Sequence, residues 1–259
     1  SRDCMSDFWM TSAAFRQTYG SGRVLFGTFS PTHLLWLGIA AVAIALAMVL
    51  FRYLGEKGRR RMFVVDTVLM LADELLKYVA TAVTGQFEVQ FLPFHLCSVN
   101  LFVALFNTIK PNKVTKNILY ALCLPGAIIA LLVPTWTSLP QWNVMFLHSE
   151  TVHMLLVLYP CMLLASGFKP DYKVLPWVAL FLLGVCVPAV ALNTIFDTNF
   201  LFLNGTVGNP VLELCKDVFG DVYQIGLVVL LVIVWFLMYL PWEIARVAKA
   251  KKLAGLAAK

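Results

Sequence analysis

A cysteine and a histidine in separate apolar segments are the residues of this chain best suited to chemistry. Cys97 ends the block 92–97 (LPFHLC), and His153 lies in a later apolar segment. Because proline is tolerated in the first turn of a helix, Pro93 predicts a helix that starts just before Cys97. A thiol near a helix N-terminus, with a histidine in reach, is stabilised as the thiolate. We therefore predict Cys97 as a nucleophile and His153 as its general base, with a cysteine that only packs as the alternative.

Charged residues near these two positions share helix faces, because residues three or four apart lie on the same side of a helix. Glu150 precedes His153 by three residues, so its carboxylate is expected to hold the imidazole in one tautomer. Asp73 and Glu74 precede Lys77 by four and three residues. These charges either contribute to a polar pocket or neutralise one another within their own helix, and the spacing leaves both possibilities open.

The composition indicates an integral membrane protein with helical spans. Of 259 residues, 60% are hydrophobic and 13% are charged, whereas a soluble domain has roughly 25% charged residues. Apolar runs of about 20 residues predict helices rather than the shorter strands of a barrel. The net charge of +6 does not indicate nucleic acid, because the basic residues flank apolar segments. We expect no cofactor and no soluble protein partner.

We predict an all-α fold with seven transmembrane helices. The second span is the least hydrophobic, since it carries Asp66, Asp73, Glu74 and Lys77, but the residues around these charges are apolar. The expected spans are 32–54, 62–83, 91–107, 115–134, 144–166, 174–196 and 222–247.

The distribution of Lys and Arg predicts the orientation of the spans. Most of these residues follow the first, third and fifth spans or lie in the C-terminal tail. By the positive-inside rule, the N-terminus is outside and the C-terminus is cytoplasmic. Residues 1–31 then form an extracytoplasmic segment, either interfacial or disordered, 32–247 the transmembrane domain and 248–259 a basic cytoplasmic tail. The connection 197–221 is expected to be an ordered outer loop that could cap a cavity.

The polar residues of the spans gather in the outer half of the membrane. Polar groups are costly there and suggest function by default. Cys97 and His153 are expected at comparable depth, and the asymmetry predicts a polar cavity that opens outward. Interhelical hydrogen bonding and solvation at the interface are the alternative explanations. The candidate substrate-binding residues are His95, Asn100, His148, Asn193, His33, Lys77, Glu74 and Tyr223.

The remaining cysteines have no spacing typical of a metal site. Three are expected to pack in the spans as small hydrophobic residues: Cys123, Cys161 and Cys186. Cys4 and Cys215 could both lie outside and pair, although the sequence does not fix the connectivity. A metal site is a further alternative, disfavoured because His95 and Cys97 point to opposite sides of a helix; its ligands would be His95, Cys97, His148 and His153.

With these residues placed, the sequence resembles the YwaF-like bacterial integral membrane proteins, which are related to eukaryotic transmembrane protein 164. The resemblance rests on the block 92–97, on His33 at the start of the first span, on His153 and on the segment 193–202, and it covers about residues 29–252. It implies a seven-helix fold. From the eukaryotic relatives it also implies a phospholipid acyltransferase whose cysteine carries the acyl group as a thioester, assisted by a histidine.

The resemblance assigns these roles to Cys97 and His153, and more distant relatives hydrolyse lipid esters. Phe94, Ser98 and Phe200 depart from the family's pattern without removing a reactive group, so they bear on substrate choice. The leading hypothesis is a membrane-embedded phospholipid acyltransferase, or a lipid-ester hydrolase when water replaces the acceptor. Its partner would be a membrane phospholipid or lysophospholipid, and its location a bacterial plasma membrane.

A second hypothesis belongs to a different functional class. A seven-helix carrier for a solute or ion, or a ligand-binding membrane protein, could use the same outward-facing polar pocket. Asp73, Glu74 and Lys77 would then contact the ligand. We detect no inverted repeat in the sequence, which counts against a carrier.

Overall fold

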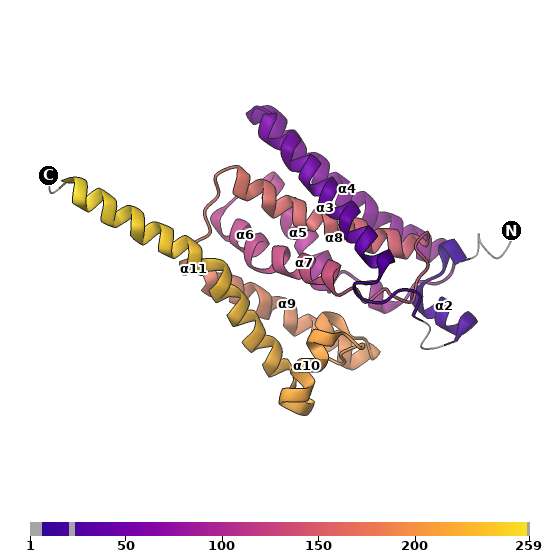
Figure 1. The fold of residues 1–259 in the computed structure, drawn as a ribbon. Helices are drawn as coiled ribbons and strands as arrows, with labels where there is room; N and C mark the ends of the chain where they lie inside the picture. The colour runs from indigo at the N-terminus through magenta and orange to yellow at the C-terminus, as the bar shows by residue number, and fades with distance from the viewer. Residues whose placement is uncertain (1–6, 21–23, 258–259) are drawn as a thin grey trace.

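The computed structural model describes residues 7–20 and 24–257, and the regular elements of that part of the chain are all helical. The helices pack lengthwise, and the long helix α11 runs out to the C-terminus along one side (Figure 1). The α-helices are α2 (Ser12–Tyr19), α3 (Pro31–Tyr53), α4 (Glu56–Val83), α5 (Leu96–Ile109), α6 (Lys113–Ile118), α7 (Leu124–Leu132), α8 (Val144–Ala165), α9 (Leu175–Phe196), α10 (Pro210–Phe219) and α11 (Gln224–Ala257). Short 3-10 segments include η1 (Val89–Phe91) and η4 (Phe200–Phe202), and a π-helical turn, η2 (Leu119–Cys123), joins α6 to α7.

Six helical segments within the described residues are long and apolar enough to cross a membrane. They are Pro31–Tyr53, Val89–Ile109, Lys113–Leu132, Val144–Ala165, Tyr172–Phe196 and Gln224–Ala254. The expectation of an all-α polytopic membrane protein is thereby confirmed. These segments correspond to six of the seven expected spans. The other expected span, 62–83, lies within α4, a helix of 28 residues whose charged side chains lower its average hydropathy.

Helix α4 has a polar buried face and an apolar exposed face, the reverse of a helix at the surface of a soluble protein. Its polar face is turned inward, where α4 packs against α5 and α8. The residues of each face recur every three or four positions, as the helical period requires. The large apolar side chains exposed on this helix are Val64, Val65, Val68, Leu69, Leu75, Leu76, Val79 and Val83. The buried face consists of Asp66, Thr67, Met70, Glu74, Lys77, Ala80 and Thr81.

Helix α8 is central and fixes the position of α5. It contacts α3, α4, α5 and α7. Tyr159 of α8 is fully buried, and its hydroxyl accepts a hydrogen bond from Asn107 at 3.1 Å and bonds to Thr108 at 2.8 Å. A buried polar group needs such partners. The contacts therefore fix the register between α5, which carries Cys97, and α8, which carries His153.

Cys123 has a structural role between η2 and α8. Proline lacks an N–H group, so Pro160 leaves the carbonyl of Leu156, four residues earlier, without its helical partner. The thiol of Cys123 donates to that oxygen at 3.2 Å. Cys123 is 2% exposed, in agreement with the expectation that it packs in the interior.

A similar contact attaches α11 to the bundle. Pro125 cannot donate to the carbonyl of Ala121, four residues earlier. The indole N–H of Trp235 in α11 donates to that oxygen at 2.9 Å. The interruption of the helix in the η2 region thus provides an acceptor that anchors α11.

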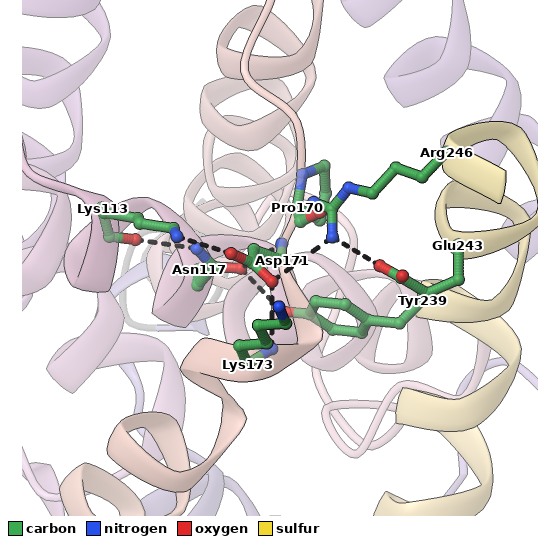
Figure 2. A network of polar contacts seen from close by, with 8 residues as sticks. All are labelled: Lys113, Asn117, Pro170, Asp171, Lys173, Tyr239, Glu243 and Arg246. Carbon is green, nitrogen blue, oxygen red and sulfur yellow. Dashed lines mark hydrogen bonds and ion pairs between the residues drawn. The ribbon is translucent and has the colours of Figure 1, made fainter. Parts of the chain in front are cut away.

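A second attachment of α11 is a set of polar contacts that we call the Asp171 cluster: Lys113, Asn117, Asp171, Tyr239 and Arg246 (Figure 2). Lys113 Nζ lies 2.5 Å from the carboxylate of Asp171, and Arg246 Nη1 lies 3.4 Å from it. Asn117 Oδ1 accepts from the backbone N–H of Asp171 at 3.1 Å and from the hydroxyl of Tyr239 at 3.0 Å. The hydrogen bond from Lys113 is the main cause that lowers the pKa of Asp171. The cluster therefore joins α11 to α6 and to the loop that precedes α9.

The connection 197–221, expected to be a loop, contains the helix α10. Asn209 caps this helix, because its Oδ1 accepts from the N–H groups of Val211 at 3.0 Å and Leu212 at 3.3 Å. Pro210 occupies the first turn. Asn and Pro are favoured at helix starts as well as in turns, which explains the difference. Cys4, the suggested partner of Cys215, lies outside the described residues.

Residues 7–20 pack on the end of the bundle where α8 begins. Asn143 Nδ2 donates to the carbonyl groups of Asp7 at 2.7 Å and Met10 at 2.8 Å. Gln86, which follows α4, accepts from the N–H of Thr11 at 2.8 Å and donates to the carbonyl of Trp9 at 3.1 Å. This part of the N-terminal segment is therefore ordered against the bundle.

Candidate active site around Cys97

Cys97 is the second residue of α5, so the helix starts just before it, as predicted, although Pro93 precedes the helix by three residues and does not lie in its first turn. The helix begins at Leu96, and the preceding residue, His95, makes no side-chain cap. The first amide of this region with a helical acceptor is that of Val99, which donates to the carbonyl of His95 at 3.0 Å. The N–H groups of Leu96 and Cys97 have no acceptor among the described residues. Free amides at a helix start favour a nearby negative charge.

A buried ion cluster lies between α4, α5 and α8: Asp73, Glu74, Lys77, Ser98 and His148. Lys77 Nζ is 2.6 Å from Glu74 Oε1, and the hydroxyl of Ser98 donates to the same oxygen at 3.1 Å. His148 Nε2 lies 3.7 Å from the other oxygen of Glu74. His148 Nδ1 lies 2.9 Å from Asp73 Oδ2, although the two atoms are not aligned as a hydrogen bond. Lys77 thus neutralises an acid of its own helix, one of the two possibilities left open by the spacing.

The imidazole of His153 is held in one tautomer by its own helix. Its Nδ1 lies 2.6 Å from the carbonyl oxygen of Ser149. Because a carbonyl only accepts, the proton lies on Nδ1 and Nε2 keeps its lone pair. The ring stacks on Trp136, with centroids 5.3 Å apart and planes at 14°. A neutral imidazole with Nε2 as acceptor is the form that can serve as a general base.

Glu150 reaches His153 through Trp136. Its Oε1 accepts from the indole N–H of Trp136 at 3.1 Å, and the indole stacks on His153. The sequence predicted a carboxylate bonded to the imidazole. Among the described residues, that place is taken by the carbonyl of Ser149 instead. Glu150 therefore orients the ring only indirectly.

Cys97 and His153 are connected through shared neighbours rather than by a direct hydrogen bond. Glu74 and Lys77 lie within electrostatic reach of Cys97. Ser98, the residue after Cys97, bonds to Glu74 of α4, and His153 lies on α8, which packs against both α4 and α5. Catalytic hydrogen bonds are often long in a protein without substrate and shorten when substrate binds.

Asn100 shares the helix face of Cys97, three residues further along α5. It is 1% exposed, and its Oδ1 has no hydrogen-bond partner. A buried polar group without a partner costs about 1–3 kcal/mol. Such a group next to a nucleophile is available to a bound substrate.

His95 is attached to the loop that follows α9. Gln90 Nε2 lies 2.6 Å from His95 Nε2, and Gln90 Oε1 accepts from the N–H of Asn199 at 2.8 Å. The imidazole packs on the rings of Phe200 and Phe202, with centroids 5.0 Å and 6.1 Å away. The loop 197–203 therefore covers the start of α5.

Asn193 and Tyr223 organise this loop. Asn193 Oδ1 accepts from the N–H of Phe200 at 2.7 Å and from the hydroxyl of Thr198 at 2.9 Å. Its Nδ2 donates to the carbonyl of Phe200 at 3.0 Å. The hydroxyl of Tyr223 donates to the carbonyl of Phe202 at 2.5 Å. Both residues were predicted to bind substrate, but the loop occupies the polar atoms of Asn193 and the hydroxyl of Tyr223.

His33 is bonded on both sides of its ring. Its Nδ1 accepts from the N–H of Phe29 at 2.8 Å, and its Nε2 donates to the carbonyl of Leu131 at 2.8 Å. It is 1% exposed. These contacts join the start of α3 to the end of α7, so both ring nitrogens already have protein partners.

The described residues contain no group of three or more His, Cys, Asp and Glu side chains arranged to hold a metal ion. The three histidines of the alternative metal site are engaged separately. His95 is bonded to Gln90 and His153 to Ser149, whereas His148 faces Asp73. The structure therefore does not bring them together as a ligand set.

An apolar groove runs along α5 on the face opposite Cys97. Successive residues of a helix turn by about 100°, which places the groove residues of α5 roughly half a turn from the thiol. Its volume is about 330 Å³, and it is lined by Pro93, Val99, Phe102, Val103, Phe106, Thr115, Ile118 and Phe181. The groove offers apolar surface at the depth of the spans but does not contain the sulfur of Cys97.

The sequence reasoning missed the roles of Ser98, Gln90 and Trp136. Ser98 follows the predicted nucleophile directly, and a small polar residue at a buried helix start was a usable indication. Gln90 lies in the short segment before α5 and reaches a residue 109 positions away, which no local pattern reveals. Trp136 is buried against His153 rather than exposed at a membrane surface.

Comparison with known proteins identifies one family. A family model described as the TMEM164 family matches residues 28–239 of the chain. No curated protein and no solved structure matches it. The matched region begins before α3, ends within α11 and includes Cys97 and His153.

Proposed function

Because the chain belongs to the TMEM164 family, we propose that it is a membrane-embedded phospholipid acyltransferase that acts as a lipid-ester hydrolase when water is the acceptor. Cys97 is the nucleophile and His153 the general base. The observation that carries the proposal is the position of Cys97 at the uncapped start of α5, next to Ser98 of the buried ion cluster. Helix α5 packs against α8, where Nε2 of His153 keeps its lone pair. The resemblance to thioester-forming acyltransferases points to the same cysteine.

In the first half-reaction the thiol proton passes to His153 Nε2, and the sulfur attacks the ester carbonyl of a phospholipid. The S–C bond forms and the ester C–O bond breaks. The leaving lysophospholipid oxygen takes the proton from Nε2. In the second half-reaction Nε2 accepts the proton of a lysophospholipid hydroxyl or of water, whose oxygen attacks the thioester. The C–S bond breaks, and the departing sulfur takes the proton back from Nε2.

The developing negative charge on the carbonyl oxygen needs hydrogen-bond donors. The N–H groups of Leu96 and Cys97 at the start of α5 have no acceptor among the described residues and are available for this role. One such donor is typically worth about 3 kcal/mol of the barrier. Glu74 and His148 form the polar wall of the site, and His33 stabilises the packing of α3 on α7.

The proposal includes the placement of the protein in the membrane. The exposed apolar face of α4 supports a seventh span in addition to the six apolar segments. The basic residues then place the N-terminus outside and the C-terminus in the cytoplasm. A bacterial plasma membrane and a phospholipid or lysophospholipid substrate complete the proposal, with Cys97 in the outer half of the bilayer.

Intact-protein mass spectrometry tests this function. Purified protein incubated with a phospholipid of known acyl chains is expected to gain the mass of one acyl group. The adduct should be absent in Cys97→Ser, and should form more slowly in His153→Gln. Cys161→Ser is the matched control, because Cys161 is another partly buried cysteine of the bundle. An adduct that persists in Cys97→Ser, or that never forms in the wild-type protein, would refute the covalent mechanism.

A carrier is the second candidate, and Asp66 is the observation that favours it. Both carboxylate oxygens of Asp66 are buried without a hydrogen-bond partner, and the residue is 3% exposed. Intramembrane acids of this kind occur in ion pathways. Cation flux into proteoliposomes that survives Cys97→Ala and is lost in Asp66→Asn would favour a carrier. Flux no greater than that of empty liposomes would exclude it.

A further inference from the structure

Three basic side chains line a surface pocket at the start of α4, which we call the basic pocket. Its volume is about 430 Å³, and it is lined by Lys57, Arg60, Arg61, Val64 and Val65. These positions are three or four residues apart, so they share one face of the helix. All five residues are exposed. The basic pocket therefore presents three positive charges at one end and two apolar side chains at the other.

The three cations of the basic pocket have no anionic partner in the described part of the chain. Lys57, Arg60 and Arg61 form no hydrogen bond or ion pair through their side chains there. Glu56 lies four residues before Arg60 but is not paired with it. Lys57 is three and four residues from the two arginines, and like charges at this spacing repel each other on a helix. A bound anion would remove this repulsion.

Arg59, in the same basic run, has a different role. Its Nε donates to the carbonyl of Phe51 and its Nη2 to the carbonyl of Arg52, both at 3.2 Å. Its guanidinium also lies over the ring of Phe51, 5.3 Å from the centroid. Arg59 therefore fixes the turn between α3 and α4. The three cations of the basic pocket make no such contact with the turn.

The length of the apolar face of α4 places the basic pocket at the level of the lipid phosphates. This face carries exposed apolar side chains from Val64 as far as Val83. The two residues are 19 positions apart, which corresponds to about 29 Å along a helix and matches a hydrocarbon thickness of about 30 Å. The basic residues precede this stretch by about one turn. When α4 crosses the membrane, they lie at its surface.

We propose that the basic pocket binds the headgroup of an anionic phospholipid. Arg60 and Arg61 donate to the phosphate oxygens, and Lys57 adds a third positive charge. One acyl chain then lies along Val64 and Val65. Guanidinium groups bind phosphate through paired hydrogen bonds, and basic clusters next to a membrane span attract anionic lipids.

This lipid is distinct from the substrate of the candidate active site. The basic pocket precedes the apolar stretch of α4 and lies at the cytoplasmic surface, whereas Cys97 is proposed to lie in the outer half of the bilayer. The inference therefore rests on the proposed placement of α4 across the membrane. It does not rest on the chemistry of Cys97.

Native mass spectrometry of protein released from detergent micelles tests the site. The probes are phosphatidylglycerol, which is anionic, and phosphatidylcholine, which is zwitterionic. A basic residue near an anionic lipid typically strengthens binding by about fivefold. Arg60→Gln/Arg61→Gln should therefore weaken binding of phosphatidylglycerol by about 20-fold or more and leave binding of phosphatidylcholine unchanged.

The matched control removes two charges from another connection on the same side. Lys169 and Lys173 precede α9, are exposed and form no ion pair in the described part of the chain. Lys169→Gln/Lys173→Gln should keep the affinity of the wild type for phosphatidylglycerol. Equal losses in the two double variants would show that the lipid responds only to total charge, and would overturn the site.

Arg60→Lys/Arg61→Lys separates lipid binding from the orientation of the spans. Lys and Arg count alike in the positive-inside rule, so this variant keeps the signal for insertion. Lysine keeps the charge but not the paired hydrogen bonds of a guanidinium, so the affinity for phosphatidylglycerol should lie between those of the wild type and Arg60→Gln/Arg61→Gln. An affinity as low as that of the glutamine variant would contradict binding through charge.

Two further measurements identify the ligand and separate the site from catalysis. Free glycerol phosphate should compete only weakly with phosphatidylglycerol, because it has no acyl chain to pack on Val64 and Val65. Competition equal to that of the lipid would indicate a soluble anion and overturn the proposal. Cys97→Ser should bind phosphatidylglycerol as the wild type does. Binding that persists in a protein that forms no acyl adduct would support the basic pocket and refute only the proposed function.

Discussion

Two lysine–carboxylate pairs of nearly equal length lie in contrasting parts of the molecule. Lys77 is 2.6 Å from Glu74, and their side chains are 8% and 6% exposed. Lys113 is 2.5 Å from Asp171, and their side chains are 63% and 13% exposed (Figure 2). Water screens the second pair, whereas the first has only protein neighbours to compensate its charges. The comparison shows that the surroundings of an ion pair, rather than its length, determine what its loss costs.

Removal of one lysine from each pair should produce the largest difference. Lys77→Met leaves Glu74 buried without its cation, which costs about 3–5 kcal/mol of the free energy of unfolding. Lys113→Met, at the exposed pair, should cost less than about 1 kcal/mol. Unfolding by SDS titration in mixed micelles measures both values.

A double substitution provides the control for this prediction. Glu74→Gln added to Lys77→Met removes the uncompensated charge and should restore much of the stability. Equal costs for the two single lysine variants would contradict the contrast between the buried and exposed pairs.

An intermediate effect is expected at Ser98, which extends the buried pair onto α5. Its hydroxyl donates to Glu74 at 3.1 Å, and a hydrogen bond to a charged group contributes about 1.5–3 kcal/mol. Ser98→Ala should therefore lower the free energy of unfolding by about that amount. Ser166→Ala is the matched control, since that hydroxyl bonds only to the carbonyl of Met162 near an exposed helix end. If Ser98→Ala left the free energy of unfolding unchanged, the hydroxyl of Ser98 would contribute nothing to the stability of the buried ion cluster.

The smallest effect is expected from pH at the Asp171 cluster. The ordinary pKa of an aspartate is 3.8, and the hydrogen bond from Lys113 lowers that of Asp171 in the folded protein. The stabilisation is therefore complete above the ordinary pKa and is lost as the pH falls through the lowered folded value. Asp171→Asn should flatten the dependence of thermal stability on pH at and below about pH 4. An unchanged profile would show that the carboxylate adds nothing to the attachment of α11.

The features that the sequence predicted well are local. The start of α5 just before Cys97 was predicted correctly, although Pro93 lies before the helix and not in its first turn. The Glu74–Lys77 contact follows from a spacing of three residues. The inward polar face of α4 also follows a helical period, although its average hydropathy conceals the apolar face. Information within one or two turns of a helix was sufficient for these predictions.

The features that were not predicted depend on which segments become neighbours. Ser98 and Glu74 are 24 residues apart, and Asn199 and Gln90 are 109 apart. Asn209 and Pro210 were read as loop residues but start α10, because the same two residue types suit turns and helix starts. Residue type alone therefore does not distinguish a turn from a helix start at positions 209 and 210.

The account depends most on the action of His153 on the thiol of Cys97. Alkylation of Cys97 by a small membrane-permeant maleimide, followed by peptide mass spectrometry over a range of pH, measures the thiolate available at this position. We predict that His153→Gln slows alkylation of Cys97 by about tenfold or more near neutral pH, because a neighbouring base favours the thiolate, and leaves alkylation of Cys161 unchanged. Equal rates at Cys97 in the wild type and in His153→Gln would contradict the account.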